Sequence, residues 1–210
     1  DIAQCLVGSE MCIRDSCYFV RNQGSRECVV IDPGDRFKKI KNYIDENDLD
    51  VKAILLTHGH YDHIGQTKAL KELTGAEIYI HALDKDKLVD PDKSLASFSY
   101  AKCEPAPADV LLQGGEVLHI AGMDIKVIHT PGHSSGGVCY IIENSIFCGD
   151  TIFCGGSYGR YDFYDGNFGK LCDSVNKILS LPGNFDIYPG HGESTSSQAE
   201  RALNPLYKKV

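Results

Sequence analysis

The sequence predicts a mixed α and β fold in one domain. Short apolar runs that suit buried strands alternate with segments whose apolar residues recur at helical spacing. Two hairpin-led halves each continue into such strands and helices, so we expect an α/β or α+β arrangement. With 210 residues and 42% hydrophobic composition, the chain can form one substantial core.

In the first half, strand and helix signals follow one another closely. Residues 17–20 and 28–31 predict a hairpin around a polar turn at 22–24, and its second strand ends in Asp32-Pro33-Gly34. Phe37, Ile40 and Ile44 recur at helical spacing, which predicts an amphipathic helix through about Glu46. A buried strand over 51–56, a helix over 64–73 with Leu70 and Leu73 inward and Gly75 at its end, and a strand over 78–80 ending at His81 follow.

The second half begins with an irregular segment over about 84–108 that can contain helix. Strand pairs are then predicted over 117–120 with 125–129 and over 138–142 with 145–148, and a Gly- and Tyr-rich loop spans 151–166. A capping-box pattern over 197–200 opens a last short helix that ends before Pro205. Between them lies a helical stripe that we expect to face the core: Phe168, Leu171, Cys172, Val175, Ile178 and Leu179.

One stretch carries most of the functional information. Thr57-His58-Gly59-His60-Tyr61-Asp62-His63 places three imidazoles and a carboxylate directly after the buried strand over 51–56. Imidazole nitrogen and carboxylate oxygen are ligands that Zn²⁺ and related divalent ions accept. The alternative is a surface loop that happens to be rich in histidine.

Further ligand-type residues follow other strand-like runs. The runs 125–128, 145–148 and 186–188 lead respectively to a turn with His133, to Gly149-Asp150 and to Pro189-Gly190-His191. Glycines at these points let the backbone turn sharply. Four strands therefore deliver ligands to one rim, which argues against a chance histidine-rich loop.

Composition limits the classes of partner. A formal charge of −8 and a pI near 5.4 disfavour nucleic acid, whose phosphates attract basic surfaces. No apolar run is long enough to cross a bilayer. The nine cysteines form no C-x-x-C pair, so we expect free thiols in a reducing cytoplasm, most of them in the core. Cys154 follows Asp150 and either lines the site or packs in the core or a loop.

The N-terminus is unusual. Residues 5–16 can be written, codon for codon, as a common sequencing adapter, so we interpret residues 1–16 as a non-native segment preceding a domain over 17–210. The alternative is a genuine first strand.

The ordered motifs H-x-H-x-D-H, TPGH, GDT and PGH resemble the signature of the metallo-β-lactamase superfamily, and within it the short glyoxalase II-like hydrolases. The similarity runs from about Cys17 to the C-terminus. It implies a four-layer αβ/βα sandwich with the metal site at the rim between two mixed sheets.

The resemblance also implies a ligand set. It places His58, His60 and His133 on one divalent ion, Asp62, His63 and His191 on a second, and Asp150 between the two. Zinc is the expected ion, with iron or manganese as alternatives. Two such ions share a water and make it a hydroxide near neutral pH, and this hydroxide would attack the substrate carbonyl. Asp62 can also accept a proton during catalysis.

Thioester hydrolysis fits this equipment, because a thiolate leaves readily. The expected substrate is an S-acyl or hydroxyacyl thioester of a small thiol. Two alternatives remain: a persulfide dioxygenase with one iron on His58, His133 and Asp150, and a metal-binding module without catalysis. Asp150, where the best-known zinc β-lactamases have Cys, argues against antibiotic hydrolysis.

Three further residues match family positions. Arg160 and Tyr161 lie in a segment resembling the substrate side of the site, and Arg160 matches a basic residue that contacts a carboxylate of the thiol carrier. Arg160 can instead form a salt bridge with Asp162. Asp32 matches an acidic position near the metals and either bonds a ligand histidine or forms a turn. The resemblance further implies that Phe98 or Tyr100 covers the site.

Overall fold

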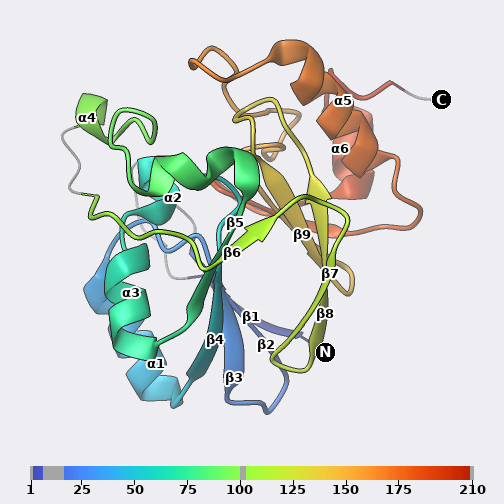
Figure 1. Cartoon of the computed structure of the whole chain (residues 1–210). Coiled ribbons are helices and arrows are strands. Elements are labelled where there is room, and N and C mark those ends of the chain that lie inside the picture. Colours follow the sequence, from blue (N-terminus) through green and yellow to red (C-terminus); the bar gives the residue numbers. More distant parts are fainter. Residues whose placement is uncertain (1, 7–16, 100–102, 209–210) are drawn as a thin grey trace.

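The computed structural model describes residues 2–6, 17–99 and 103–208. Two six-stranded sheets face each other, with helices on both outer sides (Figure 1). The order of the first sheet is β1-β2-β3-β4-β5-β6, and that of the second is β12-β11-β10-β9-β8-β7. The four-layer arrangement implied by the resemblance is therefore confirmed.

The first sheet combines an antiparallel edge with a parallel centre. β2 pairs antiparallel with β1 and β3, whereas β3, β4, β5 and β6 run parallel. The strands are β1 (Ile2–Leu6), β2 (Tyr18–Asn22), β3 (Glu27–Ile31), β4 (Asp50–Leu55), β5 (Glu77–His81) and β6 (Val110–Leu112).

The second sheet is antiparallel except at one pair. β10 and β11 run parallel, so both lead toward the same edge. Its strands are β7 (Val117–Ile120), β8 (Met123–His129), β9 (Val138–Ile142), β10 (Ser145–Gly149), β11 (Asp186–Pro189) and β12 (Thr195–Ser196).

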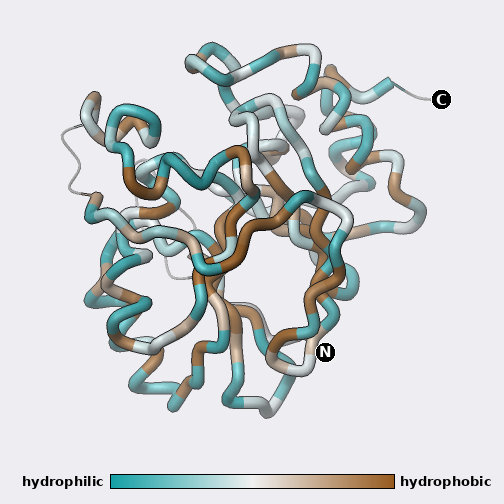
Figure 2. The backbone as a smooth tube through the Cα atoms, in the orientation of Figure 1, coloured by the Kyte–Doolittle hydropathy of each residue, from teal (hydrophilic) through white to brown (hydrophobic). Residues whose placement is uncertain are grey.

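The core consists of three apolar layers. Figure 2 shows the hydrophobic residues concentrated in the strands at the centre of the molecule. In β4, Ile54 packs beneath the helices, while Ala53 and Leu55 face the other sheet, because successive side chains of a strand point to opposite faces. Burial on both faces explains why the strand is a continuous apolar run.

Helices cover both outer faces. α1 (Phe37–Asn47) and α3 (Thr67–Thr74) pack on the first sheet through Ile40, Ile44 and Leu70, and α5 (Phe168–Leu179) packs on the second. The other helical segments are α2 (Tyr61–Ile64), the 3₁₀ helix η1 (Ala82–Leu88), α4 (Ala96–Ser99) and α6 (Ser197–Leu203). Within the described residues, no helix has the length and apolar character needed to span a bilayer.

Three details of the helices differ from the predictions. The helix expected over 64–73 is interrupted, because the Gln66 N–H leaves the helical pattern and donates to the Pro33 carbonyl at 2.8 Å. Leu73 is 40% exposed, since it lies on the outer side of α3. Phe168 is exposed as well, because it lies in the first turn of α5, where it packs on Tyr161.

The predicted capping box is shifted by one residue. Ser196, not Ser197, caps α6 by accepting from the Ala199 N–H at 3.1 Å. The Glu200 carboxylate instead accepts the N–H groups of Gly155 and Gly156, at 3.0 and 2.9 Å. Glu200 therefore fixes the loop after Asp150 and does not close its own helix.

The N-terminal prediction is only partly within the described chain. Residues 2–6 form β1 at the edge of the first sheet, and residues 1 and 7–16 lie outside the described residues. A non-native origin of residues 1–16 therefore stays a prediction.

Seven cysteines carry free thiols, as expected: Cys17, Cys28, Cys103, Cys139, Cys148, Cys154 and Cys172. Cys17, Cys28, Cys139 and Cys148 are buried in the core. Cys154 lies in the loop after Asp150 and is exposed, so the expectation that it packs in the core is wrong.

Candidate metal centre

All seven predicted ligand residues meet at one edge of the two sheets. The residues 58–63 follow β4, and the other three ligands follow β8, β10 and β11. Their ligand atoms form three overlapping groups, each with atoms within 4.8 Å of one another. The groups are His58, His60 and His133; His58, His63 and Asp150; and Asp62, His63 and His191.

The first group is the deeper one. The Nδ1 of His60 lies 2.9 Å from the Nε2 of His133, and the His58 ring is 4.7 Å from both rings, measured between centroids. All three side chains are buried. Three imidazole nitrogens thus converge in a site shielded from water.

Asp150 connects this group to the other ligands. Its Oδ2 lies 3.5 Å from the Nε2 of His133 and 3.4 Å from the Nε2 of His191, and its Oδ1 lies 3.3 Å from the Nε2 of His63. One carboxylate therefore faces imidazoles of both predicted groups. This is the position that a bridging ligand requires.

Buried atoms without partners show that this donor set fits a metal. The Nε2 atoms of His58 and His60 are buried without a hydrogen-bond partner, and the buried Nε2 of His63 and Oδ1 of Asp150 face each other at 3.3 Å. Leaving such an atom unpaired costs about 1–3 kcal/mol, so several in one place require a compensating ligand. Nitrogen and oxygen donors of this kind accept zinc, iron or manganese.

The two groups differ in the direction of their pKa shifts. Burial, reinforced by neighbouring imidazoles, holds the pKa values of His58 and His60 well below the usual range, which favours the neutral form that binds metal. Burial also opposes the charge on His63, but the Asp150 and Asp32 carboxylates outweigh it and raise that pKa well above normal. In Asp150, burial is outweighed by His133 and His63, so its pKa lies well below normal.

Asp32 supports one ligand directly. Its Oδ2 lies 2.9 Å from the Nδ1 of His63 and accepts the Thr57 hydroxyl at 2.6 Å, while its Oδ1 accepts the Thr57 N–H at 2.8 Å. The structure therefore contains the predicted hydrogen bond between Asp32 and a ligand histidine. Asp32 also turns the chain, with φ of 51°.

Arg160 supports another ligand through its backbone, a contact that has no signal in the sequence. Its carbonyl lies 2.7 Å from the Nδ1 of His133. Its side chain forms the salt bridge with Asp162, with Nε–Oδ1 and Nη2–Oδ2 distances of 2.9 and 2.8 Å, and lies over the Phe163 ring. The salt-bridge alternative is thus present in the metal-free protein.

A cavity of about 720 Å³ lies beside the ligands. Phe163 lines it and contacts the rings of His60 and His133, with centroids 5.1 and 5.7 Å away. Tyr61, Phe98 and Arg160 also line it, and a covering role of Phe98 stays a prediction. Tyr161 is not among the lining residues and packs on Phe168. Tyr100 lies outside the described residues.

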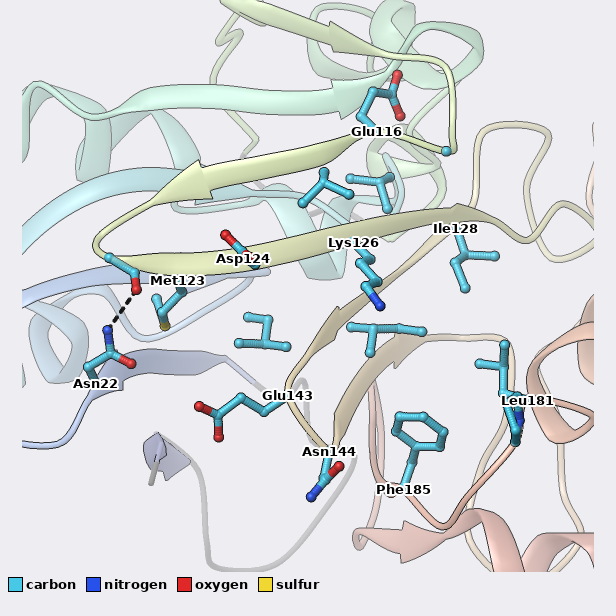
Figure 3. Close-up of a pocket in the computed structure, with 17 residues that line it drawn as sticks. Asn22, Glu116, Met123, Asp124, Lys126, Ile128, Glu143, Asn144, Leu181 and Phe185 are labelled. Atoms are coloured by element: carbon cyan, nitrogen blue, oxygen red, sulfur yellow. Dashed lines mark hydrogen bonds between the residues drawn. The ribbon is translucent and has the colours of Figure 1, made fainter.

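A larger cavity, of about 890 Å³, lies on the outer side of β7, β8 and β9 (Figure 3). Asn22, Asp124, Lys126, Glu143 and Phe185 are among its lining residues, and none of the seven ligands is. None of the seven ligands lines the smaller cavity either, but Phe163 lines it and contacts the rings of His60 and His133, so the smaller cavity adjoins the ligand cluster.

His81 and His119 lie outside the ligand cluster. His81 is buried, bonds the Gln113 carbonyl and stacks on His129 with centroids 4.1 Å apart. His119 is exposed and pairs with Asp124. Neither belongs to a ligand group within the described chain.

Comparisons with known proteins agree with this geometry. Residues 14–191 match the family model of the metallo-beta-lactamase superfamily. The chain is 34% identical over 198 residues to the probable metallo-hydrolase YqgX of Bacillus subtilis, covering 92% of each. It is 31% identical over 183 residues to a hydroxyacylglutathione hydrolase of Pelagibacter ubique, covering 86% of this chain and 68% of that protein.

Solved structures show the same fold. BLEG-1, a B3 metallo-beta-lactamase, has a TM-score of 0.90 and 33% identity, with 100% of both chains covered. TTHA1623 in a di-iron-bound form has a TM-score of 0.81 and 31% identity over 97% of this chain and 99% of that one. ETHE1 from Myxococcus xanthus has a TM-score of 0.74 and 27% identity over 93% and 84%. The fold, the ligand cluster and the match over most of its length place this chain in the metallo-β-lactamase superfamily.

Proposed function

We propose that the protein is a metal-dependent thioesterase that holds two divalent ions and hydrolyses S-acyl or hydroxyacyl thioesters of a small thiol. The position of Asp150 carries this proposal, because its carboxylate faces imidazoles of both ligand groups. Such an arrangement suits two neighbouring ions. The ligand set accepts zinc, our first choice, or iron or manganese.

The proposed division of labour follows from the geometry. His58, His60 and His133 would hold one ion, Asp62, His63 and His191 the other, and Asp150 both. Ions bound there would acidify water and polarise a substrate carbonyl.

Asp62 lies at the open side of the centre, where its side chain is 23% exposed. Burial opposes its charge, but His63 and a hydrogen bond from His191 outweigh burial and lower the pKa of Asp62. Its ionised carboxylate can therefore also accept a proton as the tetrahedral intermediate collapses. Phe163 shields the buried imidazoles and would exclude bulk water from that side.

The cavity beside the ligands supports a small-molecule substrate. Its lining is aromatic at Tyr61, Phe98 and Phe163, and its one guanidinium belongs to Arg160. We assign Arg160 to the carrier thiol, in line with the similarity to a hydroxyacylglutathione hydrolase, and keep its sequence neighbour Tyr161 in the proposal although it lies outside the cavity lining. Because Arg160 pairs with Asp162, a carboxylate of the carrier must compete with Asp162 for it.

Two relatives favour other reactions. The similarity to ETHE1 supports the alternative of persulfide oxidation at a single iron. The similarity to BLEG-1 supports β-lactam hydrolysis, and the argument from Asp150 applies only to β-lactamases that have Cys there. A metal-binding module without catalysis remains the third alternative, and a reducing cytoplasm the proposed location.

A substrate panel on protein of measured metal content tests the proposal. We expect S-lactoylglutathione or another acyl thioester to be hydrolysed with a higher kcat/KM than a β-lactam such as nitrocefin. Oxygen uptake with glutathione persulfide and no thioester turnover would favour the single-iron alternative. Preferred turnover of the β-lactam would instead favour the lactamase, and no turnover at full metal loading would favour the binding module.

A further inference from the structure

A buried ion triad lies directly behind the deeper ligand group. The Lys87 Nζ is 3.1 Å from the Oδ1 of Asp84 and 2.8 Å from the Oδ2 of Asp165. Lys87 is 2% exposed and Asp84 is fully buried. Charged side chains are buried to this extent only when they are paired and hydrogen-bonded. Packing of the surrounding core gives no reason for three charged groups at this place.

The two carboxylates bind the backbone of both ligand loops. Asp84 accepts the N–H of Gly59, between His58 and His60, at 2.9 Å, and the N–H of Gly136 at 2.7 Å. Asp165 accepts the N–H of Ser135, two residues after His133, at 2.9 Å. The triad therefore connects the loop of His58 and His60 to the loop of His133.

The loops touch the triad without any intervening group. A Cβ added at Gly59 would lie 2.6 Å from the Cβ of Lys87, and one added at Gly136 would lie 2.6 Å from the Oδ1 of Asp84. Both distances are shorter than real Cβ contacts, so only glycine permits this close approach. A displacement of Lys87 or Asp84 must consequently move the loops that carry the ligands.

The other ligand group has a separate support. Asp32 bonds His63, whereas in the described part of the chain the hydrogen bonds of Asp84, Lys87 and Asp165 do not involve Asp62, His63 or His191. The two halves of the centre therefore rest on different carboxylates.

We propose that Lys87, Asp84 and Asp165 are positioning residues for the metal position formed by His58, His60 and His133, and act on it selectively. This inference rests on the proposed two-metal function. Removing the Lys87 charge would leave two carboxylates in the interior without a counter-ion, so they must shift or bind water and release the two loops.

The test compares Lys87→Met with Lys93→Met. Lys93 lies six residues away and pairs with Asp86 in an exposed salt bridge, so its variant controls for the loss of a nearby lysine. Metal-depleted, folded protein is titrated with Co²⁺, followed by visible absorption and by competition with a chelator. For Lys87→Met we expect one of two dissociation constants to rise about 10–100-fold, with an altered Co²⁺ spectrum for that position. The control should keep both constants within about twofold, as expected for a change at an exposed salt bridge.

Two double variants, in which Lys87→Met is combined with His60→Ala or with His191→Ala, identify which metal position is affected. In His60→Ala, which already lacks the deeper position, Lys87→Met should have no further effect on the remaining constant. In His191→Ala, the effect should persist, because the deeper position remains. Unchanged constants in Lys87→Met, or equal losses at both positions, would overturn the inference.

Two outcomes need separate treatment. If Lys87→Met does not fold, Asp165→Asn takes its place, because it keeps the Asp84–Lys87 pair while weakening the acceptor for the Ser135 N–H. This variant should raise the dissociation constant of the same metal position. Unchanged constants would overturn the inference. If the unsubstituted protein binds no Co²⁺ at all, the proposed function itself fails. That result differs from the binding of two Co²⁺ ions with dissociation constants that are unchanged in Lys87→Met.

Discussion

The two halves of the metal centre differ in depth and in charge. His58, His60 and His133 are buried, whereas the side chains of Asp62 and His191 are about one-quarter exposed. In the deeper half, burial holds the pKa values of His58 and His60 well below the usual range, and the outer half pairs imidazoles with carboxylates. The difference indicates that the deeper half is fixed by the protein, while the outer half is open to substrate and to changes in pH.

Removal of Asp150 should break both halves at once, because this carboxylate is the contact between them. Loss of an outer partner of a metal ligand alone costs about 10–100-fold in affinity or activity. We therefore expect Asp150→Ala to lower kcat/KM by more than about 100-fold and to lower the bound metal, measured by elemental analysis. Asp124→Ala, which changes an exposed carboxylate paired with His119, is the control. Normal metal content in Asp150→Ala would contradict a bridging role.

A change of pH should act on the outer half. Burial opposes the charge of His191, but hydrogen bonds to Asp150 and Asp62 raise the pKa of His191 to about 10 in the metal-free protein. A histidine with a raised pKa stabilises the fold below its unfolded pKa of about 6.5, and this contribution disappears as the pH rises toward 10. Metal-free protein should therefore lose stability between about pH 7 and pH 10, measured by urea unfolding.

The affinity for metal should depend on the same proton of His191, but it should increase with pH where the stability of the metal-free protein decreases. An ion must displace this proton from His191, and must also displace the proton that the raised pKa of His63 retains, so affinity for the outer position should rise by at least about tenfold per pH unit over this range. In metal-free His191→Asn, the stability curve should be flatter. An equal slope in that variant would assign the pH dependence to other groups.

Asp32→Asn should weaken the outer half selectively, in contrast to Lys87→Met. The amide keeps an oxygen for the Thr57 N–H but removes the carboxylate that bonds the Nδ1 of His63. We expect one metal dissociation constant to rise about 10–100-fold, and it should be the one that survives in His60→Ala. Equal weakening of both positions would mean that the two halves share their supports.

The same comparison explains what the sequence can predict. Ligands such as His58 and Asp150 follow apolar strands directly, so local pattern and the order of motifs are sufficient to find them. Their supports depend on contacts across the fold. Asp84 and Lys87 lie in a segment without a periodic signal, and Arg160 acts on His133 through its backbone carbonyl, for which residue type carries no information.

Local errors have a similar cause. The break after α2 arises because Gln66 bonds the Pro33 carbonyl, a partner more than thirty residues earlier. Glu200 has the spacing of a capping residue, yet its carboxylate binds the loop that follows Asp150. In both cases a hydrogen bond to a residue distant in sequence determines the local structure in place of the local sequence preference. Both hydrogen bonds involve segments that adjoin ligand loops.

The smallest expected effect concerns substrate choice at the open side. Asp162 occupies the Arg160 guanidinium through two hydrogen bonds, and both side chains are exposed. Asp162→Asn should free the guanidinium for a carrier carboxylate and raise kcat/KM for S-lactoylglutathione by about two- to five-fold, as is usual for an exposed charge pair. A thioester with an uncharged carrier, such as S-acetyl N-acetylcysteamine, should be unaffected. Arg160→Gln should lower kcat/KM for S-lactoylglutathione and leave kcat/KM for the uncharged thioester unchanged. Equal changes for both substrates would show that Arg160 does not recognise the charge of the carrier.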